Sequence, residues 1–462
     1  MSFLIGVMTR RFYFAQDMGM GKSLLCIAIC RYFNRIEKVK RTLILVPNRT
    51  NKYDWLEEFK LWTKAECLLL EGSFNQKWKA LRDSNSEFVV ETYGGFTRMA
   101  SVKVRKPGKK RDQLDVDLKL MRELQSIFQA IVFDEITNAK SKASLMFRIG
   151  RFLSKNAYCV FGLSGTPFGR DVQDLWAQLY LIDLGATLGQ TLTLFRAAFF
   201  TQKATGFGGY RYKFRKAMDA RLHRMLANRM VRYVAAECDL PKVVPIIKSV
   251  ALPEIAEDYY QRMRDKLYAS KGNVKEMQNA FLRMRQISSG FMGYKDDETG
   301  ERASFEFPDK PKLQALLDLI ESTDQKLVVF HDFIFSGDCI SRELGKMKIK
   351  FARLYGKTKD PAEQMRKFNE DEDVQVMLLN NSAGGFGLNR LRVAKYAVYY
   401  ESPVSSIIRK QTLRRVQRQG SKHKSVFVYD LVVKGTVDSM ILDWHEQSEG
   451  LFAAIVEGKV KL

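Results

Sequence analysis

A glycine-rich run with a lysine and a hydroxyl residue lies near the start of the sequence, QDMGMGKS at 16–23. It follows the apolar run FYFA and precedes the helical pattern LLCIAICRYF, which is the strand–loop–helix order of a phosphate-binding loop. Glycines let backbone N–H groups turn towards phosphates, a lysine reaches the terminal phosphates, and a serine hydroxyl can bind Mg²⁺. The stricter pattern has Gly where this chain has Gln16. We expect ATP and Mg²⁺ as cofactors, held by Asp17, Met18, Gly19, Met20, Gly21, Lys22 and Ser23.

A phosphate-binding loop needs an acidic partner on a neighbouring strand, and the run AIVFDEIT at 130–137 can provide it. An apolar strand that ends in Asp-Glu directs Asp134 towards Mg²⁺ and Glu135 towards the water that attacks the phosphate. The sequence therefore predicts Lys22, Asp134 and Glu135 as catalytic residues, with Ser23 and Asp134 as the metal ligands.

The elements that must position these residues are short apolar runs. In the first part of the chain they are FYFA (12–15), TLILVP (42–47), FVVETY (88–93), AIVFDE (130–135) and YCVFGLSG (158–165). Towards the end they are KLVVFHD (326–332), VQVMLLN (374–380), YAVYYE (396–401) and VFVYDLVV (426–433). None alternates between apolar and polar residues, which is typical of parallel strands covered by helices on both faces. The pattern predicts two α/β blocks.

The segment between the blocks, about 170 to 305, is predicted to be mostly helical, and part of it is strongly basic. From Lys203 to Arg232 there are nine Lys or Arg and a single acid, with aromatic residues interleaved. A solvated helix face usually mixes the two signs of charge, so this run favours contact with nucleic acid. The residues that we expect to make this contact here are Lys213, Arg215, Arg221 and Arg224.

The whole chain is basic as well, with 76 Lys and Arg against 52 Asp and Glu and a net charge of +24 over 462 residues. This excess favours an acidic partner, and the phosphate backbone of nucleic acid is the first candidate. A second basic stretch, KVRKPGKKR at 103–111, is typical of an exposed loop or hairpin insertion. The polar, Gly- and Pro-punctuated stretch at 293–312 is typical of a linker.

The six cysteines form no CxxC pair, and the four histidines are too scattered to complete a zinc site. We therefore expect reduced thiols and no structural metal. The short apolar run at the start precedes its arginines, unlike a signal peptide, and no apolar stretch is long enough to span a bilayer. These features predict a soluble intracellular protein, in the cytoplasm of a bacterium or of an infected host cell.

Taken together in order, the motifs resemble those of superfamily II helicases, and specifically the Swi/Snf-type DNA translocases. AQDMGMGKS resembles motif I, LILVPNRTNKYDWLEEF motif Ia, FDEIT motif II and LSGTP (163–167) motif III. Two stretches, at 174–200 and MRQISSG at 284–290, also resemble the family. VVFHDF (328–333) resembles motif IV, NSAGGFGLN (381–389) motif V and QTLRRVQRQG (411–420) motif VI. In its compactness the chain resembles members encoded by phages or bacteria more than eukaryotic remodellers.

The resemblance implies roles for the later motifs. Arg415 and Arg418 are expected on one face of a helix, where they would reach the γ-phosphate and stabilise its charge, with Gln411 beginning that face. Gly387 in motif V would pass close to the nucleotide, and Ser382, Arg409 and Lys410 would contact nucleic acid. Ser164 and Thr166 of motif III would couple the ATP site to movement.

The resemblance and the strand pattern together predict an α/β fold of two tandem RecA-like lobes with helical protrusions between them. The expected parts are an ATPase lobe at 1–170, a basic helical protrusion and linker at 171–305, and a helicase lobe with a terminal helix at 306–462. Such a chain would be a DNA-dependent ATPase that moves along duplex DNA through backbone contacts, as a monomer and with little sequence specificity.

Two alternatives remain open at this point. One is a helicase that separates or anneals strands of forked DNA or RNA, for which KVRKPGKKR would be the candidate wedge. The other is a DNA-binding scaffold with a relic ATP site, which does not hydrolyse ATP.

Overall fold

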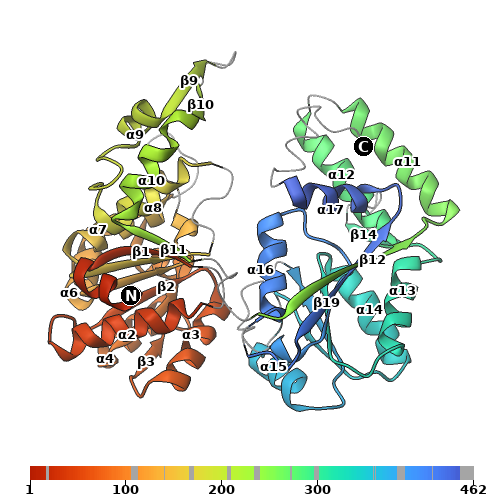
Figure 1. Ribbon diagram of the computed structural model, residues 1–462, viewed down its shortest axis with the longest axis horizontal. Helices are drawn as coiled ribbons and strands as arrows, with labels where there is room; N and C mark the ends of the chain where they lie inside the picture. The colour runs from red at the N-terminus through yellow and green to blue at the C-terminus, as the bar shows by residue number, and fades with distance from the viewer. Residues whose placement is uncertain are drawn as a thin grey trace. The chain divides into compact units, whose positions relative to one another are not determined.

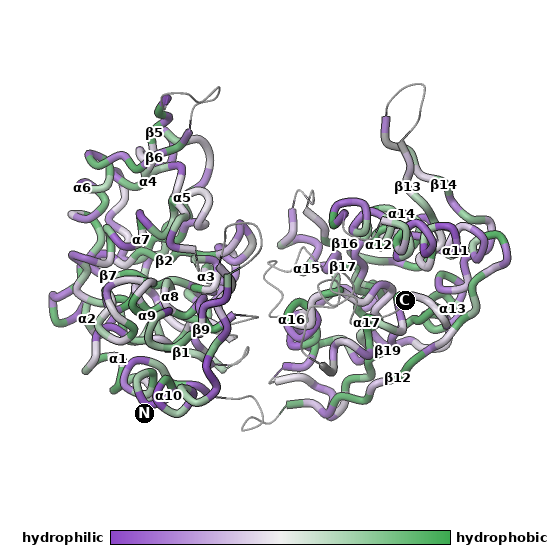
Figure 2. Tube along the Cα trace, turned by 90° about the horizontal axis from the view of Figure 1, so that it is seen from above, coloured by the Kyte–Doolittle hydropathy of each residue, from purple (hydrophilic) through white to green (hydrophobic). Residues whose placement is uncertain are grey.

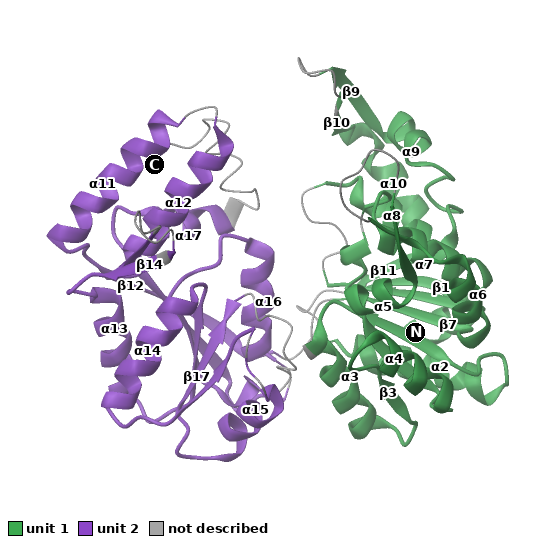
Figure 3. Cartoon of the chain, turned by 180° about the vertical axis from the view of Figure 1, so that it is seen from behind, with its two compact units in different colours: residues 1–238 green, residues 239–462 purple. Residues whose placement is uncertain are grey.

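The computed structural model describes residues 1–16, 20–105, 113–139, 141–165, 171–204, 210–233, 240–270, 273–295, 301–356, 358, 360–381, 391–418 and 420–447. It divides into unit 1, residues 1–238, and unit 2, residues 239–462 (Figure 3). The segment 171–305, expected as one protrusion and linker, therefore contributes to both units.

Unit 1 is built on a parallel sheet. Within the described residues this sheet has seven strands in the order β11-β1-β8-β7-β2-β4-β3. The strands are β1 (Arg11–Gln16), β2 (Thr42–Val46), β3 (Cys67–Leu69), β4 (Phe88–Thr92), β7 (Ala130–Asp134), β8 (Cys159–Leu163) and β11 (Met230–Tyr233). All the strands predicted from apolar runs in this part of the chain are confirmed, because their uninterrupted apolar character suits a sheet that is covered on both faces.

Helices cover both faces of this sheet, and alternate strand residues divide between two cores. Phe12 and Phe14 face the core formed with α1, α2 and α3, whereas Tyr13 and Ala15 face the core formed with the later helices. The helices of unit 1 are α1 (Ser2–Thr9), α2 (Lys22–Arg35), α3 (Arg49–Trp62), α4 (Phe74–Asp83), α5 (Tyr93–Met99), α6 (Leu118–Ile127), α7 (Leu145–Asn156), α8 (Asp174–Asp183), α9 (Leu192–Phe199) and α10 (Asp219–Ala227). Figure 1 shows α2 and α3 on the opposite side of the sheet from α7 and α8.

Among the described residues, two antiparallel hairpins extend unit 1. One consists of β5 (Ser101–Val104) and β6 (Gln113–Val116), and the other of β9 (Phe200–Ala204) and β10 (Tyr210–Phe214). The second hairpin and strand β11 lie within the segment that we expected to be mostly helical. That expectation is only partly right, because α8 to α12 are interspersed with strands.

Unit 2 has its own parallel sheet, with six strands among the described residues in the order β12-β19-β18-β15-β17-β16. The strands are β12 (Lys242–Val250), β15 (Leu327–His331), β16 (Phe351–Leu354), β17 (Val376–Asn380), β18 (Tyr396–Tyr399) and β19 (Ser425–Val433). The helices are α11 (Glu254–Ala269), α12 (Val274–Ser288), α13 (Pro311–Glu321), α14 (Ile334–Lys346), α15 (Pro361–Glu370), α16 (Ser406–Val416) and α17 (Val437–Gln447). Strands β13 (Phe291–Lys295) and β14 (Arg302–Glu306) pair as a hairpin within the stretch that we predicted to be a linker.

The apolar side chains of unit 2 form their own cores on both faces of this sheet, against α15 and α16 on one face and α13 and α14 on the other. A further core joins α11, α12 and α17. The predicted α/β fold with two parallel-sheet lobes is thus confirmed. In the described part of the chain, no helix has the length and apolar character needed to cross a membrane.

Candidate nucleotide site and nucleic-acid contacts

Three neighbouring strands of unit 1 end at the same edge of the sheet and bring the predicted catalytic residues together. Strand β8 lies between β1 and β7, and Leu163 at its end is in register with Phe14 of β1 and Asp134 of β7. The carboxyl ends of parallel strands are where α/β folds bind ligands. Lys22 is close enough to lower the pKa of both Asp134 and Glu135, against the larger effect of burial, which raises them.

The part of the phosphate loop that the structure describes has the geometry expected of it. Gly21 has a φ of 73°, in the left-handed region that favours glycine, and it is the N-cap of α2. Lys22 begins the helix and donates from Nζ to the carbonyl oxygen of Gln16, 2.6 Å away. Ser23 follows in the first turn, whose N–H groups attract anions.

Gln16, which replaces the first glycine of the strict pattern, is buried as the last residue of β1. Its side-chain amide donates to the hydroxyl of Ser2 in α1, 3.4 Å away. The predicted residues Asp17, Met18 and Gly19 lie outside the described residues.

Asp134 is held by an indole. Trp55, buried in α3, donates from Nε1 to Oδ2 of Asp134 over 2.9 Å. Burial raises the pKa of Asp134, and the bond from Trp55 and the charge of Lys22 oppose that rise. The hydroxyl of Tyr93 donates to the backbone oxygen of Asp134, 2.9 Å away. The carboxylate is therefore oriented by a side chain of the motif Ia stretch, for which the sequence alone predicts no role.

Glu135 is held by a residue at the end of β8, the strand that lies between β1 and β7. The Ser164 hydroxyl, at the end of β8, donates to Oε2 of Glu135 over 2.9 Å. Burial raises the pKa of Glu135, Asp134 adds to the rise, and Lys22, Ser164 and the backbone N–H of Gly165 lower it. Glu135 has a φ of 47°, which is uncommon for a non-glycine residue and turns the backbone sharply after β7. Thr166, the other motif III residue with an expected role, lies outside the described residues.

The motif VI residues lie in unit 2, and one expectation about them is wrong. Helix α16 ends at Val416, and Gln417 has a ψ of 87°, which is not helical. Arg415 is in the last turn of the helix and largely buried, and Gln411 is one turn earlier. Arg418 lies beyond the helix end, so the two arginines do not share a helical face.

Arg409 has an interaction that the sequence did not suggest. Its guanidinium forms a two-point ion pair with Asp430 of β19, with Nη2 2.6 Å from Oδ2, and lies 3.7 Å above the centre of the Tyr399 ring. These contacts join α16 to the sheet, so we assign Arg409 a structural role instead of the predicted contact with nucleic acid. Lys410 is exposed. Ser382 and Gly387 lie outside the described residues.

The unit 1 residues that were predicted to contact nucleic acid also divide into exposed side chains and one that is bonded within the protein. Lys213 on β10 and Arg221 and Arg224 on α10 are exposed. Arg215 is less exposed and donates from Nη2 to the carbonyl oxygens of Ala197, 2.9 Å away, and Ala198 near the end of α9. Cations are favourable at helix C-termini, so this arginine stabilises a helix end.

The basic stretch 103–111 begins in the β5–β6 hairpin, which confirms the expected hairpin insertion. Figure 2 shows this hairpin at the margin of unit 1. Lys103 and Arg105 are exposed, and residues 106–112 lie outside the described part of the chain.

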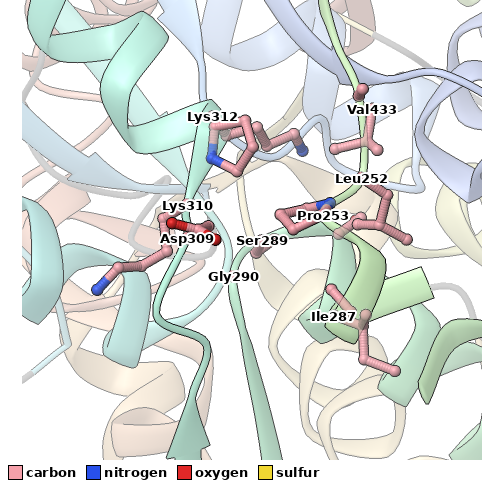
Figure 4. Close-up of a pocket in the computed structure, with 13 residues that line it drawn as sticks. Leu252, Pro253, Ile287, Ser289, Gly290, Asp309, Lys310, Lys312 and Val433 are labelled. Carbon is pink, nitrogen blue, oxygen red and sulfur yellow. The ribbon is translucent and has the colours of Figure 1, made fainter. Parts of the chain in front are cut away.

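Unit 2 also has a small pocket away from the predicted residues (Figure 4). Its lining includes Leu252, Pro253, Ile287, Ser289, Gly290, Asp309, Lys310, Lys312 and Val433. The buried Lys312 pairs with Asp438 at 2.6 Å and donates to the carbonyl oxygen of Tyr400 over 3.1 Å. Its charge is therefore balanced within unit 2.

Comparison with known proteins identifies relatives of the whole chain. A family model described as the SNF2-related domain matches residues 9–302, more than half of the sequence. The probable ATP-dependent DNA helicase CHR12 of Arabidopsis thaliana is 23% identical over 468 residues, which cover 96% of this chain and 40% of that protein. The ISWI chromatin-remodeling complex ATPase ISW1 of Saccharomyces cerevisiae is 22% identical over 469 residues, which cover 96% of this chain and 38% of that protein. This chain thus spans about two fifths of the length of these relatives.

Among solved structures, the helicase domain of Hef from Pyrococcus furiosus is similar in fold, with a TM-score of 0.52 and 16% sequence identity. The likeness covers 96% of this chain and 97% of that one. The resemblance expected from the motifs is confirmed by the family match.

Proposed function

The chain belongs to the SNF2-related domain family, and from that premise we propose that it is a motor that hydrolyses ATP to move along duplex DNA. The observation that supports this proposal most is that Lys22, bonded to the last residue of β1, and Asp134 and Glu135, at the end of β7, lie at the same edge of the unit 1 sheet. A phosphate-binding loop without a partner acid would suit binding alone, whereas this set suits hydrolysis.

The residues around the loop suit Mg²⁺ and a triphosphate. The Ser23 hydroxyl and the Asp134 carboxylate are the hard oxygen donors that Mg²⁺ prefers. When bound, Mg²⁺ supplies positive charge to the phosphate oxygens. Lys22 would exchange the Gln16 carbonyl for phosphate oxygens, and the backbone N–H groups of Met20 and Gly21 would donate to them. We assign Asp17, Met18 and Gly19 to the same loop.

Glu135 is the proposed general base. It would take a proton from water, so that a water O–H bond breaks and a carboxyl O–H bond forms. The water oxygen bonds to the γ-phosphorus, and the bond from that phosphorus to the bridging oxygen of ADP breaks. Ser164 would orient the carboxylate for this transfer.

From unit 2 we assign Arg415, Arg418, Gln411 and Gly387 to the nucleotide, on the resemblance of their sequences to motifs V and VI. Guanidinium groups stabilise the charge that spreads over a phosphoryl group in transfer. The two arginines need not share one face of a helix for this role, because each side chain is long and Arg418 lies just beyond the end of α16.

For nucleic acid we propose duplex DNA, contacted through its phosphates by Lys213, Arg221, Arg224 and Lys410, all of them exposed, and by Ser382. Contacts to the backbone carry no sequence information, which suits movement along any sequence.

The test is ATP hydrolysis with and without duplex DNA, by the intact chain and by Lys22→Ala. We expect duplex DNA to stimulate hydrolysis, and Lys22→Ala to lower kcat by roughly a hundredfold or more. Lys38→Ala, at an exposed lysine beyond α2, is the matched control and should keep full activity. If the intact chain hydrolysed no ATP, the motor would be excluded and the DNA-binding scaffold would remain as the function.

A second candidate is strand separation, favoured by the exposed basic β5–β6 hairpin. A translocase would displace a triplex-forming strand from duplex DNA and leave forked DNA paired. Release of a strand from forked DNA, reduced by Lys103→Ala with Arg105→Ala, would favour the helicase instead.

A further inference from the structure

The hairpin of β9 and β10 is a basic arm on unit 1. The sequence from Phe200 to Arg215 contains four Lys or Arg and no acid. Figure 1 shows the hairpin projecting beyond α9, away from the parallel sheet. The four residues of β9 that follow Phe200 are all exposed, and so are Tyr210 and Lys213 of β10. A two-stranded ribbon gains little stability in water by itself, so an exposed one is suited to contact with another molecule.

The base of the hairpin is fixed to unit 1 by aromatic rings and by an arginine. Phe200 is buried and in register with Phe214, and the centres of their rings are 5.5 Å apart. Further along the ribbon, the guanidinium of Arg196 lies 4.2 Å from the centre of the Tyr212 ring. Arg196 also donates from Nε to Oε1 of Gln173 over 2.6 Å. These contacts hold the exposed part of the ribbon in a defined direction.

The register of the two strands separates their side chains into two faces. Residues in register lie on the same face of a ribbon, and every second residue along a strand returns to that face. Lys203 is in register with Arg211, and Lys213 follows Arg211 by two residues. Lys203 and Lys213 therefore share one face, together with Thr201, which is in register with Lys213. Two exposed lysines on one face of an arm without acids are complementary to a row of phosphates.

The dimensions of the arm match one groove of duplex DNA. Neighbouring strands lie about 4.8 Å apart, and the major groove, about 12 Å wide, admits such a ribbon, whereas the minor groove is only about 6 Å wide. The exposed part of β9, from Thr201 to Ala204, rises about 10 Å. The major groove is about 8.5 Å deep, so the exposed part of the ribbon is long enough to enter it.

We propose that the β9–β10 hairpin enters the major groove of duplex DNA, with Lys203 and Lys213 against the phosphates that border the groove. Lys203 then becomes a second phosphate contact beside Lys213. The inference rests on duplex DNA as the partner of the proposed motor, and it assigns one element of unit 1 to one groove. The contacts need no base readout, because an arm that follows the groove moves with the chain along any sequence.

The first test is the affinity of Lys203→Gln with Lys213→Gln for a labelled duplex, measured by fluorescence anisotropy without ATP. Each phosphate contact contributes about one unit to the slope of log affinity against log salt. We expect the slope to fall by about two, and the affinity at about 0.1 M salt to fall by roughly tenfold or more. Both side chains are exposed, so the urea midpoint should stay unchanged.

Lys79→Gln with Lys119→Gln is the matched control. It removes two exposed lysines from α4 and α6 of the same unit and leaves the hairpin intact. We expect this variant to bind the duplex as the natural sequence does. An equal loss in both double variants, or no loss in the hairpin variant, would overturn the proposal, because the hairpin would then be no special DNA contact.

The second test identifies the groove. Glucosylated 5-hydroxymethylcytosine fills the major groove of a duplex, whereas netropsin occupies the minor groove of A·T runs. Glucosylation should weaken binding by the natural chain by about tenfold more than binding by the hairpin variant, since the two changes remove the same contact. Netropsin should affect both chains by the same factor. If glucosylation weakened both chains equally, the hairpin would lie outside the major groove and the proposal would be wrong.

ATP hydrolysis separates this inference from the proposed function. If the intact chain hydrolysed no ATP but the hairpin variant lost duplex affinity as expected, only the motor would be excluded. If duplex DNA stimulated hydrolysis and the hairpin variant bound the duplex with the affinity of the natural chain, the motor would remain and the role of the hairpin would be refuted.

Discussion

Trp55 donates to Asp134 from a helix far away in sequence, 79 residues before it. The bond favours the ionised carboxylate, which is the form that binds Mg²⁺. Burial acts in the opposite direction and raises the pKa of Asp134. The charge of this carboxylate, the proposed Mg²⁺ ligand, therefore depends on the Trp55 indole N–H, on Lys22 and on the backbone N–H of Glu135.

We expect Trp55→Phe to move the acidic limb of ATP hydrolysis to higher pH. The sign follows because the Trp55 bond lowers the pKa of Asp134, so its loss raises that pKa and the carboxylate is protonated at a higher pH. At mildly acidic pH we expect activity about fivefold below that of the natural sequence. The measurement is kcat against pH at saturating Mg²⁺ and ATP.

The control for this change is Trp62→Phe, which deletes an exposed indole that donates to Glu58 over 2.9 Å. Its profile should match that of the natural sequence. A limb that moves equally in both variants would show that Trp55 does not act through Asp134.

The placement of Lys22, Asp134 and Glu135 at one edge of the sheet could be predicted from the sequence, because each residue carries its signal locally, in a glycine-rich run or at the end of an apolar strand. The partners that orient them carried no such signal. Trp55, for example, looks like an ordinary core position until the fold brings it to Asp134, 79 residues later in the sequence. Contacts over such separations depend on which helix covers which strand.

Helix α16 is joined to its sheet by Arg409 and Asp430, and both side chains are largely buried. Removal of one member of a buried ion pair leaves the other charge without compensation. We expect Arg409→Ala to lower the free energy of unfolding by roughly 3 kcal/mol. Urea unfolding measures this effect.

A paired variant tests the same assignment. Arg409→Met with Asp430→Leu removes both charges and should recover most of the lost stability. If Arg409→Ala instead weakened DNA binding and left stability unchanged, Arg409 would be a phosphate contact as the sequence predicted.

The sequence predicted the central strands of each sheet but missed the strands at the sheet edges. Strands β1, β7 and β8 are buried on both faces, so their apolar runs are unmistakable. Strand β12 contains Pro245 and exposes Ile247, and as an edge strand it pairs on one side only. Its sequence therefore lacks the signal of a buried strand, and the same holds for the short edge strand β11.

At the scale of the whole molecule, the net charge of +24 predicts DNA binding that weakens steeply as salt rises. Each phosphate contact contributes about one unit to the slope of log affinity against log salt. We expect Arg221→Gln and Arg224→Gln each to reduce the slope by about one, equally for unrelated duplex sequences. Fluorescence anisotropy at several salt concentrations measures it.

Arg35→Gln, at an exposed arginine at the end of α2, is the comparison for these variants. It should leave the slope unchanged. If all three substitutions changed the slope by the same small amount, the positive charge of the chain would act as a diffuse field. No surface of unit 1 would then be a defined DNA-binding face.

The Lys22 ammonium already has a partner in the Gln16 carbonyl. A triphosphate bound as proposed would therefore compete with the Gln16 carbonyl, and the gain from this lysine would be the difference in free energy between two hydrogen bonds and not the whole of one. When the terminal phosphate departs, the carbonyl offers the ammonium a place to return to. In the proposed motor, such an exchange would lower the affinity for ADP and favour repeated turnover over tight retention.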